Sequence, residues 1–179
     1  MHRDVLKVLV TKEEIDGRIT EIGRLITEDY KEKNLLLVSV LKGSFVFMAD
    51  LVRAIDLDLN IDFMIVSSFK GKESTGVVRI INDLTIPIEG LDVLLVEDIL
   101  DSGRTLEYIT SLLKGRNPGS VEICTLLDKP SRRIAEVNAK YTGFTVPDEF
   151  VVGYGLDYNE KYRNLGYVGV LKPDAYNTF

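Results

Sequence analysis

The stretch that decides the fold is Val93–Thr105, which reads VLLVEDILDSGRT. A short apolar run bounded by polar residues is typical of a buried strand. Two adjacent carboxylates, Glu97 and Asp98, follow the run, and Ser102 and Gly103 then begin a predicted helix. The free N–H groups at a helix N-terminus form a natural site for an anion. The stretch therefore predicts a phosphate site beside a group of acids at the carboxyl end of a strand.

Each polar residue of this stretch also has a plain structural interpretation. Glu97 and Asp98 could accept hydrogen bonds from sugar hydroxyls or bind a divalent cation, but they could equally be surface acids. Asp101 or Ser102 could simply cap the helix. The sequence contains neither a Walker-type phosphate loop nor a G-x-G-x-x-G motif. The phosphate-binding groups in the turn that follows the acids favour a ligand site.

The composition of the chain excludes several classes of function. Its 179 residues predict one domain, and 45% apolar with 28% charged residues is the balance of an ordinary soluble protein. A net charge of −6 disfavours binding to nucleic acid. The only histidine is His2, so a serine or cysteine triad and a His/Cys zinc site are both unexpected. Chemistry must depend on carboxylates, Lys, Arg, Tyr and a hard metal ion.

Cysteine content and the absence of long apolar segments predict the compartment. The single cysteine, Cys124, allows no internal disulfide and lies in an apolar run typical of a core strand. The longest apolar stretches, such as Leu35–Leu41, are too short to span a bilayer, and there is no secretory signal. We expect a cytoplasmic protein that is not associated with a membrane.

The hydrophobic pattern alternates between strands and helices. A capping box at Thr11–Glu14 and isoleucines at helical spacing predict a helix over residues 12–29. Strands alternating with helices favour an α/β fold with a mainly parallel twisted sheet flanked by helices. The other predicted helices cover residues 44–54 and 104–114, and the predicted strands cover residues 35–40, 61–68, 77–81, 93–96, 121–127, 150–154 and 167–171.

The stretch Val93–Thr105 resembles the phosphoribosyl pyrophosphate (PRPP) signature of the type I phosphoribosyltransferases. The rest of the chain, over roughly residues 10–173, is similar to the hypoxanthine-guanine (6-oxopurine) branch of that family. Four further segments carry this resemblance, namely the pyrophosphate loop Leu41–Gly43, the lid Ser68-Phe69, the purine-selecting Leu127–Pro130 and the purine and pyrophosphate segment Phe150–Arg163.

The resemblance implies a fold and an activity. The fold would be the type I phosphoribosyltransferase fold, a single domain over residues 1–179, with a mobile lid at about 68–80 and a small hood from the N- and C-terminal segments. The enzyme would transfer the 5-phosphoribosyl group of PRPP to hypoxanthine or guanine. The products would be IMP or GMP and pyrophosphate, with Mg²⁺ as cofactor, in purine salvage. The family also implies a homodimer or homotetramer.

The resemblance also implies a role for each matching residue. Asp101 would be the general base, and the peptide bond before Lys42 is often cis in the family. The PRPP phosphate and ribose would be bound by Glu97, Asp98, Asp101, Ser102, Gly103, Arg104 and Thr105. Pyrophosphate would be bound by Lys42, Gly43, Ser68, Phe69 and Arg163. The purine would be bound by Lys129, Phe150, Val151 and Asp157, and the metal by Glu97, Asp98 and Asp157.

Two of these implied roles have a simple chemical basis. A lysine can donate to the 6-oxo group of hypoxanthine or guanine, whereas adenine presents a donor at that position, which Lys129 cannot accept. Phe150 would stack on the face of the base. One position departs from the family, because Phe69 stands where the lid usually carries tyrosine, so the phenolic hydroxyl is lost.

Two alternatives remain open at the level of sequence. A regulator that keeps this fold but binds RNA would need a basic patch, which the acidic composition disfavours. A transferase that prefers xanthine is harder to separate, because xanthine also carries the 6-oxo group and differs at the 2-position.

Overall fold

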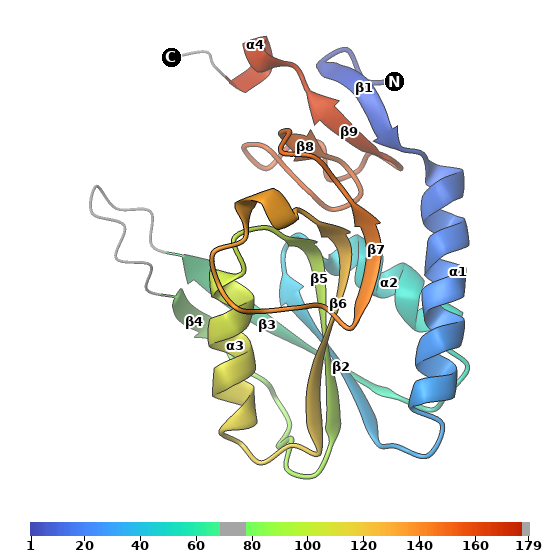
Figure 1. The fold of residues 1–179 in the computed structure, drawn as a ribbon, viewed down its shortest axis with the longest axis vertical. Coiled ribbons are helices and arrows are strands. Elements are labelled where there is room, and N and C mark those ends of the chain that lie inside the picture. The colour runs from blue at the N-terminus through green and yellow to red at the C-terminus, as the bar shows by residue number, and fades with distance from the viewer. Residues whose placement is uncertain (69–77, 177–179) are drawn as a thin grey trace.

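A six-stranded sheet forms the centre of the molecule. The computed structural model describes residues 1–68 and 78–176 (Figure 1). The strand order is β4-β3-β2-β5-β6-β7, and only the β3–β4 pair is antiparallel. The predicted α/β fold with a mainly parallel sheet is therefore confirmed. The strands are β2 Leu35–Leu41, β3 Asn60–Ser68, β4 Val78–Asn82, β5 Asp92–Leu100, β6 Ser120–Asp128 and β7 Tyr141–Thr145.

Helices cover both faces of this sheet, as Figure 1 shows. α1 (Lys12–Asp29) and α2 (Phe45–Ala54) pack on one face, and α3 (Arg104–Lys114) packs on the other. Each face has its own hydrophobic cluster, and the central strand β2 is buried along almost its whole length. Cys124 is completely buried in the α1–α2 cluster, which confirms its interpretation as a core residue.

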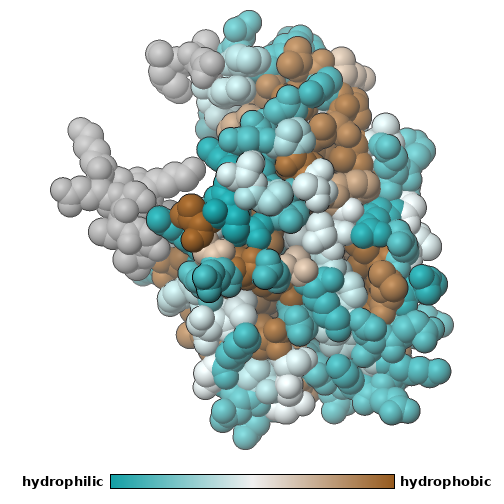
Figure 2. All heavy atoms as spheres, in the orientation of Figure 1, coloured by the Kyte–Doolittle hydropathy of each residue, from teal (hydrophilic) through white to brown (hydrophobic). Residues whose placement is uncertain are grey.

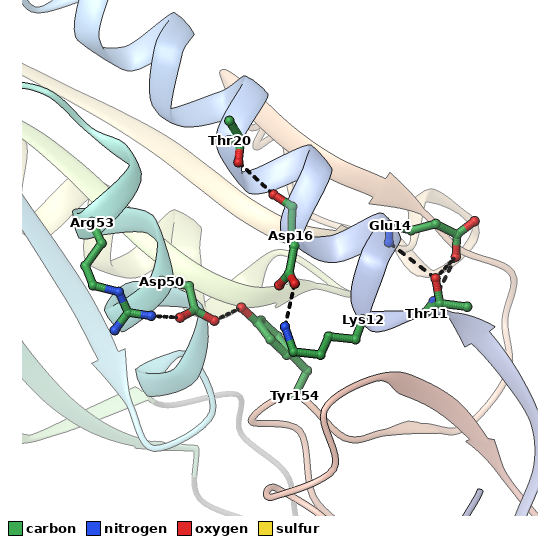
Figure 3. Close-up of polar contacts among 8 residues, drawn as sticks. All are labelled: Thr11, Lys12, Glu14, Asp16, Thr20, Asp50, Arg53 and Tyr154. Atoms are coloured by element: carbon green, nitrogen blue, oxygen red, sulfur yellow. Dashed lines mark hydrogen bonds and ion pairs between the residues drawn. The ribbon is translucent and has the colours of Figure 1, made fainter.

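The start of α1 follows the predicted capping box. The Thr11 side chain accepts from the Glu14 backbone N–H, and the Glu14 carboxylate accepts from the Thr11 backbone N–H at 2.8 Å (Figure 3). Ile15, Ile19 and Ile22 are buried on the side of α1 that meets the sheet. The reciprocal cap satisfies two N–H groups that the helix itself cannot bond.

A second, smaller sheet joins the two ends of the chain. Its order is β1-β9-β8, all antiparallel, with β1 at Val5–Val10, β8 at Val151–Val152 and β9 at Val168–Leu171. We call these three strands and the short helix α4 (Pro173–Tyr176) the hood; they lie beyond the carboxyl ends of β5 and β6 (Figure 1). Figure 2 shows hydrophobic residues gathered over this region.

Two local predictions were wrong, and two strands were not predicted. β5 does not end at Val96 but continues through the acids to Leu100, because β6 pairs with it as far as Asp128. The predicted strand 150–154 is reduced to β8, since the chain turns at Tyr154, where φ is 50°. The pattern also failed to predict β1 and β7.

Most of the predicted lid cannot be compared with the structure. Of its residues, 69–77 lie outside the described part of the chain, and Val78–Asn82 form β4. Within the described ranges, every helix is too short or too polar to cross a membrane.

The contact between α1 and α2 provides a stability test. A Cβ atom at Gly23 would lie 2.3 Å from the carbonyl oxygen of Ala54. Although alanine favours a helix by about 1 kcal/mol over glycine, we expect Gly23→Ala to lower the free energy of unfolding by about 1–3 kcal/mol through this clash.

Gly17 is the matched control, because a Cβ there meets nothing within 4 Å on the same helix. Gly17→Ala should raise the free energy of unfolding by about 0.4–1 kcal/mol. Urea denaturation measures both changes. Equal effects of the two substitutions would contradict the close packing of α1 on α2.

Candidate active site

The predicted site residues come from loops at the carboxyl end of the main sheet and from the segment Phe150–Arg163, which includes β8. The loop after β2 lies against the acids of β5, because a Cβ at Gly43 would overlap the Asp98 carboxylate at 1.8 Å. The loop after β6 starts beside β5, since the Lys129 N–H donates to the Leu100 carbonyl at 3.0 Å. Parallel strands with this arrangement bind ligands at their carboxyl ends.

The neighbouring acids Glu97 and Asp98 sit in an unfavourable environment. Burial, and then the charge of Asp98, raise the pKa of Glu97 well above its ordinary value. Burial raises the pKa of Asp98 to about 6, although the Ile99 N–H donates to its carboxylate at 2.8 Å. One buried oxygen of Glu97 has no hydrogen-bond partner in the described part of the protein. A cation or a hydroxyl donor would stabilise both charges.

The residues present fit a magnesium ion for which water and substrate supply most of the ligands. Among the described residues, no group of three or more His, Cys, Asp or Glu side chains is arranged as a metal cage. Asp157 is bound on both sides, to Arg163 at 2.9 Å and to the Glu160 N–H at 2.9 Å. Mg²⁺ typically uses one or two carboxylates together with phosphates and waters. The unpartnered oxygen of Glu97 fits that requirement.

The N-terminus of α3 has the geometry of a phosphate-binding site. Gly103 is the N-cap residue with φ of 84°, a conformation that disfavours other residues, and no side chain caps the helix. The alternative in which Asp101 or Ser102 caps α3 is therefore excluded. A cavity of about 90 Å³ lies at this end of α3, lined by Glu97, Ile99, Leu100, Asp101, Ser102, Gly103, Thr105 and Leu106. Arg104, the first residue of α3, is exposed.

Asp101 keeps one carboxylate oxygen unused. Its Oδ1 atom is buried and has no partner among the described residues, whereas Oδ2 lies 3.4 Å from the Arg132 guanidinium. Arg133 holds the Asp101 backbone, donating to its carbonyl at 3.0 Å, and also pairs with Asp128. Our sequence interpretation missed both arginines. The only signal was their position directly after the Lys129-Pro130 segment.

Lys129 is linked to the segment that holds Phe150 through Glu149. Lys129 is only 4% exposed, and its ammonium donates to the Glu149 carbonyl at 2.9 Å. The next residue, Phe150, is 40% exposed, while Val151 is buried in β8. Lys7 of β1 binds the Glu149 carboxylate at 2.9 Å. Glu149 and Lys7 were not recognised from the sequence, because their contact joins distant segments.

A third group of charges gathers around Glu160. Lys42 and Arg163 both lie near its carboxylate, at 3.2 and 3.4 Å, and Arg163 also donates to the Gly155 carbonyl at 2.7 Å. The peptide bond between Leu41 and Lys42 is cis, as the resemblance implied. The two predicted pyrophosphate-binding cations therefore converge on Glu160, an acid that was not recognised as a site residue from the sequence.

The predicted lid residues do not enter this geometry. Ser68 is the last residue of β3, and Phe69 lies outside the described residues.

Comparisons with known proteins identify the family. The model of the phosphoribosyl transferase domain matches residues 11–159. Hypoxanthine-guanine phosphoribosyltransferases of Staphylococcus epidermidis and Staphylococcus aureus are each 56% identical over 178 residues, covering 99% of both chains.

Solved structures agree with these relatives. A hypoxanthine phosphoribosyltransferase from S. aureus superposes with a TM-score of 0.95 at 56% identity, covering 98% of this chain and 96% of that one. The Trypanosoma cruzi hypoxanthine phosphoribosyltransferase in complex with the product IMP superposes with a TM-score of 0.93 at 41% identity, covering 98% and 99%. The chain belongs to the phosphoribosyltransferase family, in its hypoxanthine-guanine branch.

Proposed function

We propose that this protein transfers the 5-phosphoribosyl group of PRPP to hypoxanthine or guanine in purine salvage. The observation that carries the proposal is the start of α3, which has no side-chain cap, beside the half-buried acids Glu97 and Asp98. This pairing supplies N–H donors for a phosphate and acceptors for ribose hydroxyls within one loop. The T. cruzi relative binds IMP, the product of such a reaction with hypoxanthine.

In the proposed reaction, N9 of the purine forms a bond to C1 of the ribose as the bond from C1 to pyrophosphate breaks. The pyrophosphate leaves with the electron pair, and the proton on N7 moves to the unused oxygen of Asp101. Lys42, Arg163 and the backbone N–H of Gly43 stabilise the departing charge. Bound near Glu97, Asp98 and Asp157, Mg²⁺ would add positive charge at the pyrophosphate.

The base is recognised at the opposite end of the site. The Lys129 ammonium, held by the Glu149 carbonyl, donates to the 6-oxo group. Phe150 stacks on the purine face, and the backbone of Val151 contacts the purine edge. Asp157 lies in the same segment as Phe150 and Val151, and its carboxylate pairs with Arg163. This ion pair links the residues that contact the base to a residue that contacts the pyrophosphate.

The remaining proposals concern the whole protein. Residues 1–179 act as one domain, with residues 68–80 as a lid that excludes water during the reaction. We further propose a homodimer or homotetramer in the cytoplasm, acting on small-molecule substrates.

A steady-state assay with four bases tests this function. With PRPP and Mg²⁺, hypoxanthine and guanine should be converted to nucleotides, whereas adenine should not, because it presents a donor to Lys129. Removal of Mg²⁺ with EDTA should abolish turnover. Preferential use of xanthine would support the alternative transferase. Turnover of adenine, or salt-dependent binding of RNA without any transferase activity, would contradict the proposal.

The role of Asp101 can be tested by Asp101→Asn, which removes the proton acceptor and preserves the shape. The kcat should fall by about 10²-fold or more, with little change in PRPP affinity. Asp148 is the matched control, since it pairs with the same Arg132 at 3.3 Å and lies 3.9 Å from the Lys129 ammonium. Asp148→Asn should leave kcat near that of the unmodified enzyme. Similar losses in both variants would assign the effect to the neighbouring cations rather than to proton transfer.

Substitution of Lys129 tests base selection. Lys129→Met retains the apolar stem of this buried side chain and removes the donor. We expect the KM for hypoxanthine to rise at least about tenfold, because a charged hydrogen bond is lost, while the KM for PRPP stays near normal. Lys172→Met is the control, because that ammonium binds the Arg3 carbonyl near the N-terminus. An equal loss for both substrates would mean that Lys129 has a general structural role.

A further inference from the structure

Phe150 belongs to a cluster of three aromatic rings. The Tyr176 ring, from α4, stacks on Phe150 with centroids 5.0 Å apart and an angle of 21° between the planes. Tyr158 meets Phe150 edge-on, at 5.6 Å and 90°. Tyr158 and Tyr176 also contact each other, with centroids 6.5 Å apart. Each ring therefore touches the other two.

Several contacts hold Tyr176 in this position. The Tyr158 hydroxyl donates to the Tyr176 carbonyl at 3.4 Å, a long hydrogen bond. Tyr176 packs beside Tyr158 on a small hydrophobic cluster formed by Val5, Val152 and Leu171 of the hood strands. The Leu171 N–H donates to the Phe150 carbonyl at 2.8 Å, which fixes the strand before α4 against Phe150.

This arrangement leaves a defined part of the Phe150 ring for a ligand. Tyr176 covers one face and Tyr158 covers an edge, yet 40% of the Phe150 surface remains exposed. The χ2 angle of phenylalanine is only weakly restricted by itself. A stacked neighbour restricts it, so Tyr176 holds the partly exposed Phe150 ring in one orientation.

We propose that Tyr176 is a positioning residue for the purine, acting through Phe150. The inference rests on the proposed function, in which the base stacks on Phe150. The purine would form the third layer on the open face of Phe150, with Tyr176 on the opposite face. Offset stacking between aromatic rings is favourable on both sides of the central ring.

The effect should be confined to the base end of the site. Phe150 directly follows Glu149, whose carbonyl accepts from the Lys129 ammonium, so the ring and the base-selecting lysine share one backbone segment. The groups assigned to the phosphate and ribose of PRPP belong to the end of β5, the turn after it and the start of α3, outside the hood. Loss of Tyr176 should therefore affect the purine and leave PRPP unaffected.

The test compares substitutions of Tyr176 by steady-state kinetics. Tyr176→Leu keeps an apolar side chain but removes the ring, and Tyr176→Ala removes both. Each should raise the KM for hypoxanthine about 3- to 10-fold, the range expected for a lost aromatic stack, with kcat and the KM for PRPP near normal. Tyr176→Phe should restore the KM for hypoxanthine, because the ring rather than the hydroxyl makes the stack.

Tyr108→Ala is the matched control, because Tyr108 is an exposed tyrosine on α3, and it should change neither KM. An unchanged or lowered KM for hypoxanthine in Tyr176→Leu would overturn the inference; a lowered value would mean that Tyr176 competes with the base. An equal rise in both KM values would also overturn it. Failure of the unmodified protein to use hypoxanthine would instead overturn the proposed function.

Discussion

Two neighbouring carboxylates lie half-buried at the end of β5, which costs free energy because their charges lose part of their hydration. The pKa values of Glu97 and Asp98 are both raised by burial, and a buried oxygen of Glu97 lacks a partner in the described structure. Elsewhere in a sheet of this kind, such positions are apolar. The arrangement is favourable only when a ligand brings positive charge or hydroxyl donors to this point.

The elements around the acids are placed to receive such a ligand. Gly43 allows the loop after β2 to lie directly on Asp98, where any side chain would collide with the carboxylate. On the other side, the left-handed Gly103 turns the chain into α3 without a side-chain cap, which leaves its N–H groups available. The segment between β8 and β9 adds Arg163, whose charge lowers the pKa of Asp98 in part. Charge, donors and acceptors thus lie near the carboxyl end of β5.

Much of this could be predicted from the sequence, for identifiable reasons. The α1 helix was marked by a local capping box and by regularly spaced isoleucines. Local signals also placed the start of α3 close to Gly103. The full length of β5 was missed, because Glu97 and Asp98 interrupt its apolar pattern and only pairing with β6 extends it. The hood strand β1 was missed because it is stabilised by β9, at the far end of the sequence.

The same distinction between local signals and contacts of distant segments applies to the site. The residues that matched the family motif were identified, but their partners were not. Contacts such as Arg132 with Asp101, Glu160 with Lys42, and Tyr176 with Phe150 join segments that meet only in the folded chain. No periodicity or short motif in the sequence predicts such contacts.

Glu97 and Asp98 are expected to bind PRPP together with a cation. Isothermal titration calorimetry of PRPP binding, with and without Mg²⁺, measures this for the unmodified protein and for Glu97→Gln. Removal of Mg²⁺ or the substitution should weaken PRPP binding by at least about tenfold, since charged interactions are lost. PRPP affinity that is the same under all these conditions would contradict it.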